Sequence, residues 1–413
     1  MKWLQVLILG NCVLFIDTLQ SAFDIDVKGF KQRNIEKPSN EMVIKGPHEA
    51  FVENIRTNTS LIRKIINNEN LIIENISIGK ITKTKCAVCY MQNIANPDLI
   101  NEVKYRLNNL EVDSLLSAGE LEQLIVDSND LGIPQVLSTE RPDKVSKFLL
   151  GGRVAIIVNG TPYGLIVPAV LIDFLSSSED SNLKVDFGNF LRVLRIIAAF
   201  LTLLLPGLYI AITSFHQEIL PTSLLFSILA SRANVPFPII AEVLLMEISF
   251  ELIREAGLRV PSAIGSTIGI VGALVLGQAA VSAGIVSPIL IIIVAITGIA
   301  SFSIPDFSFG FHLRYFRFFF ILMGYMAGFL GIAVGLFVYI SLLCNQKSFG
   351  VSYTAPFAPS TKKNGNGYML PPIWKREYRA PYTAPIKEKS QEKISMKWKF
   401  NSEKGDNRWQ KQK

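Results

Sequence analysis

Three glutamates recur at every fourth position within an apolar stretch of the chain, at Glu247, Glu251 and Glu255. Residues four apart share one face of an α-helix, so this spacing predicts an acidic stripe on a helix expected over residues 239–256. Ionisable groups at membrane depth commonly face a cavity or a partner, and such a stripe would suit a cation path in an oligomer. The alternative is the solvated face of an interfacial helix, with the glutamates paired to nearby arginines.

The other reactive residues offer little catalytic chemistry. The 413 residues contain only three histidines, and they hold no G-x-S-x-G, phosphate-binding loop, H-E-x-x-H or dinucleotide glycine motif. Gln278 is polar within an apolar run and joins the three glutamates as a candidate lining of an ion path. We therefore predict that the chain is not an enzyme and carries no cofactor.

Cys86 and Cys89 form a single C-x-x-C. A zinc site would need two further ligands, and His48 is the only histidine in the first half of the chain. The surrounding residues 81–92 favour a β-strand, in which cysteine serves as a small apolar residue. We therefore predict no metal site.

The composition divides the chain into unlike parts. Hydrophobic residues make up 49% of it and the mean hydropathy is +0.34, but nearly all long apolar runs lie within residues 196–345. A soluble chain rarely reaches a positive mean, because its surface must be wetted. We expect an α/β soluble N-terminal domain over residues 1–188, followed by an all-α polytopic membrane domain over residues 189–345.

Local patterns in the first domain alternate between helix and strand. The segment Trp3–Ile16 favours two strands joined at Gly10-Asn11 over a signal peptide, because no small-x-small cleavage site follows it cleanly. The further elements expected are helices over residues 45–72 and from Asn96 onward, and strands over 81–92, 154–158 and 163–167, the last two joined by a turn at Asn159-Gly160.

The membrane domain is expected to hold four spans and one re-entrant or amphipathic segment. The spans are residues 191–213, 262–284, 286–304 and 318–344, and the other segment is 214–260. Arg192 and Arg195 stand at the start of the first span and indicate that this end faces the cytoplasm. Four spans would leave Arg314 and Arg317 on the outer side, which the charge rule disfavours, so the topology stays open.

Small residues recur at every fourth position in two of these spans, where they would let helices approach closely. They are Gly265, Gly269 and Gly277 in one span, and Gly324 and Gly328 in the other. Two such series predict a packed helical bundle rather than isolated anchors.

The last segment, residues 346–413, is strongly basic. It carries 15 Lys or Arg against five Asp or Glu, a formal charge of +10. We expect a mostly disordered tail held near anionic lipid or retained in the cytoplasm. A nucleic-acid-binding arm is disfavoured, because no folded nucleic-acid module accompanies the tail.

An ordered series of motifs over residues 5–358 resembles the A-subunit family of GerA-type spore germination receptors. The matching stretches include Ile44-Lys-Gly-Pro-His-Glu-Ala-Phe51, Thr139-Glu-Arg-Pro-Asp143, Pro206-Gly-Leu-Tyr209, Phe215-His-Gln-Glu218, Arg254-Glu-Ala-Gly257, Gly277-Gln-Ala-Ala280 and Ser348-Phe-Gly350. So many motifs in order are far more specific than a lone fingerprint. Family members usually have a further N-terminal subdomain, so we expect this chain to be shortened at its N-terminus.

The resemblance implies a function and partners. It implies a multi-pass subunit of a germinant receptor in the spore inner membrane, with the soluble domain and the tail in the cytoplasm. Such a subunit would couple germinant sensing to monovalent cation release as an oligomeric channel-type subunit. Its expected partners are a permease-like B subunit and a lipoprotein C subunit. The alternatives are a secondary transporter, disfavoured because no internal repeat is evident, and a paralogous spore membrane protein without a nutrient partner.

Overall fold

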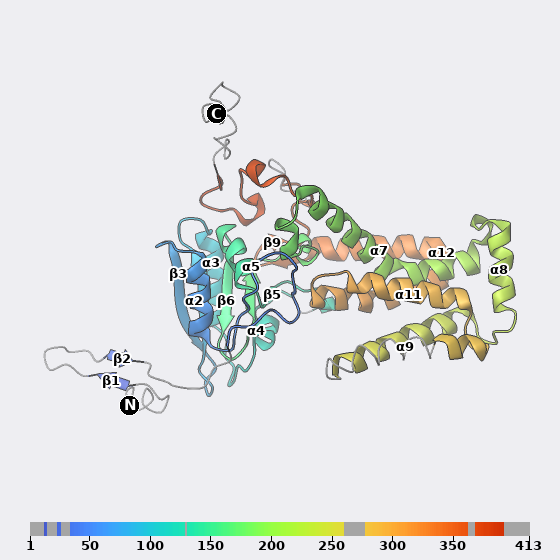
Figure 1. Ribbon diagram of the computed structural model, residues 1–413, viewed down its shortest axis with the longest axis horizontal. Coiled ribbons are helices and arrows are strands. Elements are labelled where there is room, and N and C mark those ends of the chain that lie inside the picture. Colours follow the sequence, from blue (N-terminus) through green and yellow to red (C-terminus); the bar gives the residue numbers. More distant parts are fainter. Residues whose placement is uncertain are drawn as a thin grey trace, which may run out of the picture.

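An α/β domain and a bundle of long helices lie end to end in the structure, a computed structural model (Figure 1). The residues it describes are 12–14, 23–25, 34–128, 130–259, 277–361 and 368–391. Gly265, Gly269 and the turn expected at Gly10-Asn11 therefore lie outside the described residues. A short hairpin of β1 (Cys12–Leu14) and β2 (Phe23–Ile25) precedes the domain.

Five strands form one antiparallel sheet in the order β3-β4-β6-β7-β5. Their bounds are Leu71–Ile78 (β3), Thr84–Met91 (β4), Leu137–Thr139 (β5), Val154–Val158 (β6) and Gly164–Val167 (β7). Both β6 and β7 are buried along their whole length, which explains their continuous apolar sequence. The hairpin predicted at Asn159-Gly160 is confirmed, with Ile157 opposite Gly164 and a φ of +93° at Gly160.

Helices cover both faces of this sheet. The core on one face includes side chains from α2 and α5, and the core on the other includes side chains from α3 and α4. The bounds are Ile55–Ile65 (α2), Pro97–Asn108 (α3), Ala118–Ile125 (α4), Pro142–Leu150 (α5) and Leu171–Phe174 (α6), with short 3₁₀ turns at Asp130–Gly132 (η1) and Ser178–Ser181 (η2). The α/β part of the predicted fold class is thus confirmed, whereas the polytopic membrane domain stays a prediction.

The first of these helices is shorter than the predicted range of residues 45–72. The side chain of Asn54 accepts hydrogen bonds from the backbone N–H groups of Arg56 and Thr57, so it caps the helix and fixes its start. In the same way Asn96 caps α3 by accepting from the N–H of Asp98.

Cys86 and Cys89 lie on the buried strand β4, as predicted. They belong to the cores on opposite faces of the sheet, because residues three apart on a strand point in opposite directions. They therefore cannot hold one metal ion together. Burial raises the pKa of both thiols to about 12.

The second part of the chain is a bundle of helices. Their bounds are Val185–Phe215 (α7), Thr222–Arg232 (α8), Ile239–Arg259 (α9), Pro288–Phe302 (α11) and Phe307–Asn345 (α12), with a 3₁₀ turn at Gln217–Ile219 (η3). Two of the described helices, α7 and α12, are long and apolar enough to cross a membrane, and α11 is a shorter apolar helix. Most of the expected span 262–284 lies outside the described residues.

The expected span 318–344 is not one straight helix, which corrects the prediction. Within α12 the backbone leaves the helical conformation at Ala327 and at Gly328, whose φ is +57°. Beyond this break the chain doubles back, because Tyr339 packs against His312 and Phe316. Gly328 therefore forms the turn between two antiparallel arms, where glycine tolerates the positive φ. It does not serve as a small residue on one face of a continuous helix.

Close approach of α7 and the first arm of α12 depends on two glycines. A Cβ atom added to Gly207 would lie 2.6 Å from the carbonyl oxygen of Phe320, and one added to Gly324 would lie 2.5 Å from that of Gly207. Gly324 thus occupies a helix crossing of the kind that small residues permit. Gly277 is less constrained, since an added Cβ would only reach ordinary contact with Ile291.

The helices α9 and α11 run in the same direction. Glu242 contacts Ser287, and further along Arg254 contacts Ser301. Residues 304–308, which follow α11, line a cavity together with residues of the α/β domain. The start of α12, with Arg314 and Arg317, therefore lies at the end of the bundle that adjoins the α/β domain. The number of spans and the side on which each of them ends stay predictions.

Much of the tail is folded, which differs from the expectation of a mostly disordered segment. It forms β8 (Lys347–Ser348), β9 (Val351–Ser352), η4 (Ile373–Lys375) and η5 (Pro381–Thr383). The Ser348 hydroxyl donates to the Gln135 carbonyl and accepts from the Ala169 N–H, so the segment is held by the α/β domain. The basic composition did not reveal these buried hydrogen bonds.

Alkylation tests the placement of the two cysteines in a Cys12→Ser/Cys344→Ser background. With a pKa of about 12, roughly one thiol in ten thousand is ionised at pH 8, and the thiolate is the reactive form. We expect iodoacetamide to label Cys86 and Cys89 only after unfolding in guanidinium. Lys85→Cys, exposed on the same strand, should react in the folded protein. Rapid labelling of Cys86 in the folded state would contradict the buried strand.

Candidate functional site

The acidic residues of α9 face three arginines. Glu251 accepts hydrogen bonds from Arg314 (Nη1 to Oε2, 3.0 Å) and Arg317 (Nη2 to Oε1, 2.9 Å). Arg254 lies 3.7 Å from the same carboxylate, and Arg317 lies 3.0 Å from a carboxylate oxygen of Glu247. These five side chains form what we call the bundle cluster, which ties α9 to the first arm of α12.

The bundle cluster is partly buried and carries a positive excess. The side chains of Glu247 and Arg317 are both 0% exposed. Three guanidinium groups against two carboxylates leave a formal charge of +1. Arg254 donates to the Ser301 hydroxyl of α11 (2.6 Å), whereas Nε and Nη1 of Arg317 have no hydrogen-bond partner among the described residues. The predicted acidic stripe is thus not a bare negative surface.

The structure does not bring the four predicted ion-path residues together. Glu247 is buried and Glu251 is half-buried, whereas Glu255 and Gln278 are exposed. A four-residue spacing advances about 40° beyond a full turn at each step, so Glu255 has rotated away from the face that carries Glu247. The three glutamates along α9 thus differ in exposure, and their part in an ion path stays a prediction.

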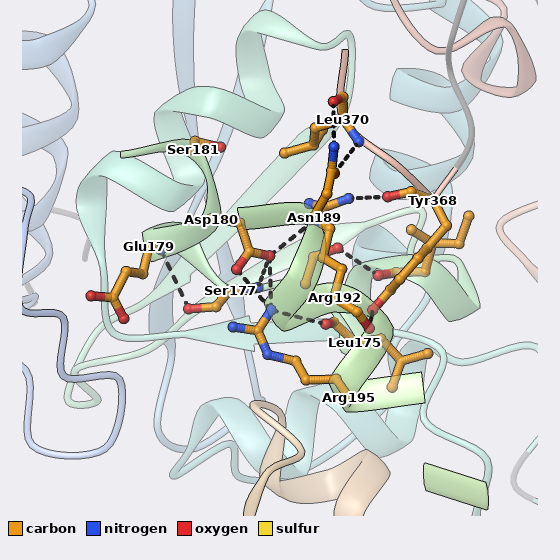
Figure 2. A network of polar contacts seen from close by, with 12 residues as sticks. Leu175, Ser177, Glu179, Asp180, Ser181, Asn189, Arg192, Arg195, Tyr368 and Leu370 are labelled. Atoms are coloured by element: carbon orange, nitrogen blue, oxygen red, sulfur yellow. Dashed lines mark hydrogen bonds and ion pairs between the residues drawn. The ribbon is translucent and has the colours of Figure 1, made fainter. Parts of the chain in front are cut away.

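A second group of buried charges lies where the α/β domain meets α7 (Figure 2). Asp180 of η2 is 0% exposed and accepts hydrogen bonds from Arg192 Nε (3.0 Å) and Arg195 Nη1 (2.8 Å). The Ser177 N–H also donates to this carboxylate, at 3.2 Å. An added Cβ on Gly188 would lie 2.6 Å from the Asp180 carbonyl oxygen, so glycine permits this close approach. We call Asp180, Arg192 and Arg195 the junction cluster.

The tail covers the junction cluster. Arg192 Nη1 donates to the Tyr368 carbonyl, and the Tyr368 hydroxyl donates to the Arg192 carbonyl at 2.7 Å. Asn189 and Leu370 exchange two hydrogen bonds, of 3.0 and 2.8 Å (Figure 2). Residues 368–370 therefore cross the start of α7 as a strap that is bonded on both sides of Arg192.

A third contact ties the tail to the α/β domain. Arg153 binds the Asp173 carboxylate with two hydrogen bonds, of 2.6 and 3.1 Å, and donates to the Tyr382 hydroxyl at 3.0 Å. Its guanidinium carbon also lies 4.5 Å from the centre of the Phe148 ring. Burial raises the pKa of the Tyr382 hydroxyl, so it remains neutral beside the ion pair.

The sequence indicated part of this site. Arg192 and Arg195 were expected at the start of the first span, and the structure adds that both bind the buried carboxylate of Asp180. The cytoplasmic side that they indicated stays a prediction. Asp180 was missed, although it lies within a serine-rich segment and closes a capping box with Ser177. A serine and an aspartate three residues apart, followed by two arginines at the same spacing, could have indicated this buried ion pair.

The arrangement defines a class of protein: a folded α/β domain joined by buried ion pairs to an apolar helical bundle suited to a membrane. Comparison with known proteins agrees. Residues 1–382 match the family described as Bacillus/Clostridium GerA spore germination protein. The chain therefore belongs to the GerA spore germination protein family, and its role lies in spore germination.

Individual relatives are similar over most of the chain. Spore germination protein KA of Bacillus subtilis (strain 168) is 42% identical over 388 residues, which cover 94% of this chain and 71% of that protein. Spore germination protein A1 of the same organism is 41% identical over 369 residues, covering 89% and 77%. A crystal structure of the N-terminal domain of the A subunit of the Bacillus megaterium spore germinant receptor GerK3 is 45% identical, covers 30% of this chain and 97% of that one, and has a TM-score of 0.25.

Replacing Asp180 tests the junction cluster. Asp180→Asn would leave two guanidinium groups without their buried counter-charge, and breaking a buried pair costs about 3–5 kcal/mol. We expect earlier thermal unfolding and faster proteolysis between η2 and α7. Asp186→Asn removes an exposed carboxylate from the first turn of α7 and is the matched control, with an expected change below about 1 kcal/mol. Equal stability of the two variants would contradict a structural role for Asp180.

Proposed function

We propose that this chain is the A-type membrane subunit of a germinant receptor, which couples germinant sensing to the release of monovalent cations. The observation that carries the proposal is the family match over residues 1–382, which includes both the α/β domain and the bundle. The apolar lengths of α7 and α12 support a place in a membrane. We place the chain in the spore inner membrane as a multi-pass protein, with the α/β domain and the tail on the cytoplasmic side.

The proposal includes partners. The motifs shared with A subunits point to a permease-like B subunit that binds the germinant and to a lipoprotein C subunit. Many large apolar side chains on the bundle are exposed, including Leu330 (72%) and Phe337 (74%), which suits a surface covered by lipid or by other subunits. Several copies of this chain would then surround the cation path as a homo-oligomer.

The charges of α9 suggest how such a path is held closed. In the single chain Glu247 and Glu251 are bound to arginines, so their charges are not available to passing cations. Glu255 and Gln278 lie at the exposed surface, where a neighbouring copy can meet them. We propose that these two line the path between copies and that the bundle cluster fixes the helix that carries Glu255.

Spores carrying a deletion of this gene test the proposed function. Germinant-triggered potassium release should be lost on deletion and restored by the 413-residue chain. Restored release would support a working receptor subunit. Release that is unchanged by deletion would contradict the proposal, and it would favour a paralogue with another trigger.

A second experiment compares the arginine-bound Glu247 and Glu251 with the exposed Glu255. The double substitution Glu247→Gln/Glu251→Gln leaves three buried arginines without counter-charge, and loss of one partner of a buried pair costs about 3–5 kcal/mol. We expect less folded receptor and little potassium release. Glu255→Gln should leave the amount of folded protein unchanged and alter only the rate of release. Normal germination when all three glutamates are replaced together would contradict any role for them in the cation path.

A further inference from the structure

A cavity of about 320 Å³ lies beside the junction cluster. Its wall comes from α6, α7, both arms of α12 and the tail, and the residues used below are Leu175, Ala199, Leu203, Leu313, Tyr339 and Tyr368. The volume is at the lower end of the range typical of sites for small molecules. This one space is therefore shared by α6, α7, α12 and the tail.

The cavity offers nothing to a polar ligand. Apart from its two tyrosines, the lining side chains are aliphatic or phenyl groups. The Tyr368 hydroxyl already donates to the Arg192 carbonyl, and the Tyr339 hydroxyl lies 3.1 Å from Nε2 of His312. A polar molecule would lose its bonds to water without replacement, which is unfavourable. The occupant must therefore be a hydrocarbon.

The mouth of the cavity is on the apolar flank of the bundle. Phe200 and Ile340 line the cavity and are 56% and 54% exposed, so the space reaches the surface between α7 and the second arm of α12. Ile197, one turn before Phe200, is also exposed (52%). In the membrane placement proposed above, this flank faces lipid.

Positive charge lies beside the cavity. Leu175 lines it, and the Leu175 carbonyl lies 3.5 Å from Nη1 of Arg195. Tyr368 also lines it and is bonded to Arg192, as Figure 2 shows. Two arginines share the single carboxylate of Asp180, so the junction cluster carries a formal charge of +1. A ligand with a hydrocarbon chain and an anionic end would satisfy both features.

From this geometry we infer that the cavity holds one acyl chain of an anionic phospholipid, with the headgroup phosphate on the Arg195 side. The inference rests on the proposed membrane placement and goes beyond it by assigning a specific lipid site. The chain would fill space between α7, α12 and the tail strap, so a lipid would stabilise the packing of the junction. Small polar germinants are not candidates for this site, because the lining offers no hydrogen-bond partner to replace water.

Photocrosslinking of the full-length chain in phosphatidylcholine nanodiscs tests the inference. The probe is phosphatidylglycerol with a diazirine in its acyl chain, and the labelled residues are mapped by mass spectrometry. We expect labels on lining residues of α7 and α12 in addition to the exposed flank. Ala199→Trp fills the cavity and should remove the lining labels while keeping those at Phe337. Val334→Trp is the matched control, because Val334 is exposed on the second arm of α12. This variant should keep the labels in the cavity and the labels at Phe337.

The outcomes separate this inference from the membrane placement. Labels at Phe337 but none in the cavity, or lining labels equally strong in Ala199→Trp, would overturn the lipid site alone. The absence of labels at Phe337 as well would overturn both proposals. Crosslinks from the lining to another copy, or to another segment of this chain, would show a protein occupant and also overturn the lipid site.

Native mass spectrometry provides a measurement that does not depend on a variant folding. We expect the unaltered chain to retain one phosphatidylglycerol after detergent exchange has removed the others. Phosphatidylcholine should be retained less, because it lacks a net negative charge for Arg195. Complete loss of lipid from the folded chain, or equal retention of the two lipids, would contradict an anionic site.

Discussion

The buried carboxylate of Asp180 fixes how the two parts of this protein meet. It holds Arg192 and Arg195, which lie one turn apart on α7, and so it sets both the rotation and the direction of that helix. Neither arginine could remain in this place without it, since an unpaired buried charge is strongly destabilising. The α/β domain and the first long helix are therefore one packed unit at their junction, rather than two bodies on a free linker.

The rest of the bundle follows from the direction of α7. The glycine crossing at Gly207 and Gly324 sets the first arm of α12 beside α7, and the break at Gly328 brings the chain back toward the α/β domain. The second arm ends near the α/β domain, so the tail that follows can reach it. The tail residues Ser348 and Tyr382 then bind Gln135 and Arg153 of the domain. The reversal inside α12 thus brings the tail beside the domain, and the tail's own side chains hold it there.

The sequence was most informative where the signal is local. The helix expected from Asn96 onward formed with Asn96 as its cap, the hairpin at Asn159-Gly160 formed, and the cysteines packed on a buried strand. Gly324 stood in a small-residue series and lies at a helix crossing. These features depend on a few neighbouring residues, for which propensity and periodicity are sufficient physical descriptions.

The failures share a different cause. The run from residue 318 to 344 is equally apolar on both sides of Gly328, so hydropathy could not show that it turns back. The pattern around Arg192 and Arg195 could not show the partner that buries them, because Asp180 comes from another element. The spacing of the α9 glutamates left a lining and arginine pairing both open, because the partners on α12 are more than 60 residues away. In each case a long-range pairing decided the role of a residue whose local pattern was ambiguous.

Both charge clusters contain one more arginine than acid, and in each of them a single carboxylate is shared by two or more guanidinium groups. Each cluster also binds a long apolar helix, α7 in one case and α12 in the other, and these two helices pack directly on each other. The junction cluster therefore anchors α7 to the α/β domain and the bundle cluster anchors α12 to α9, while the close packing of α7 on α12 lies between them.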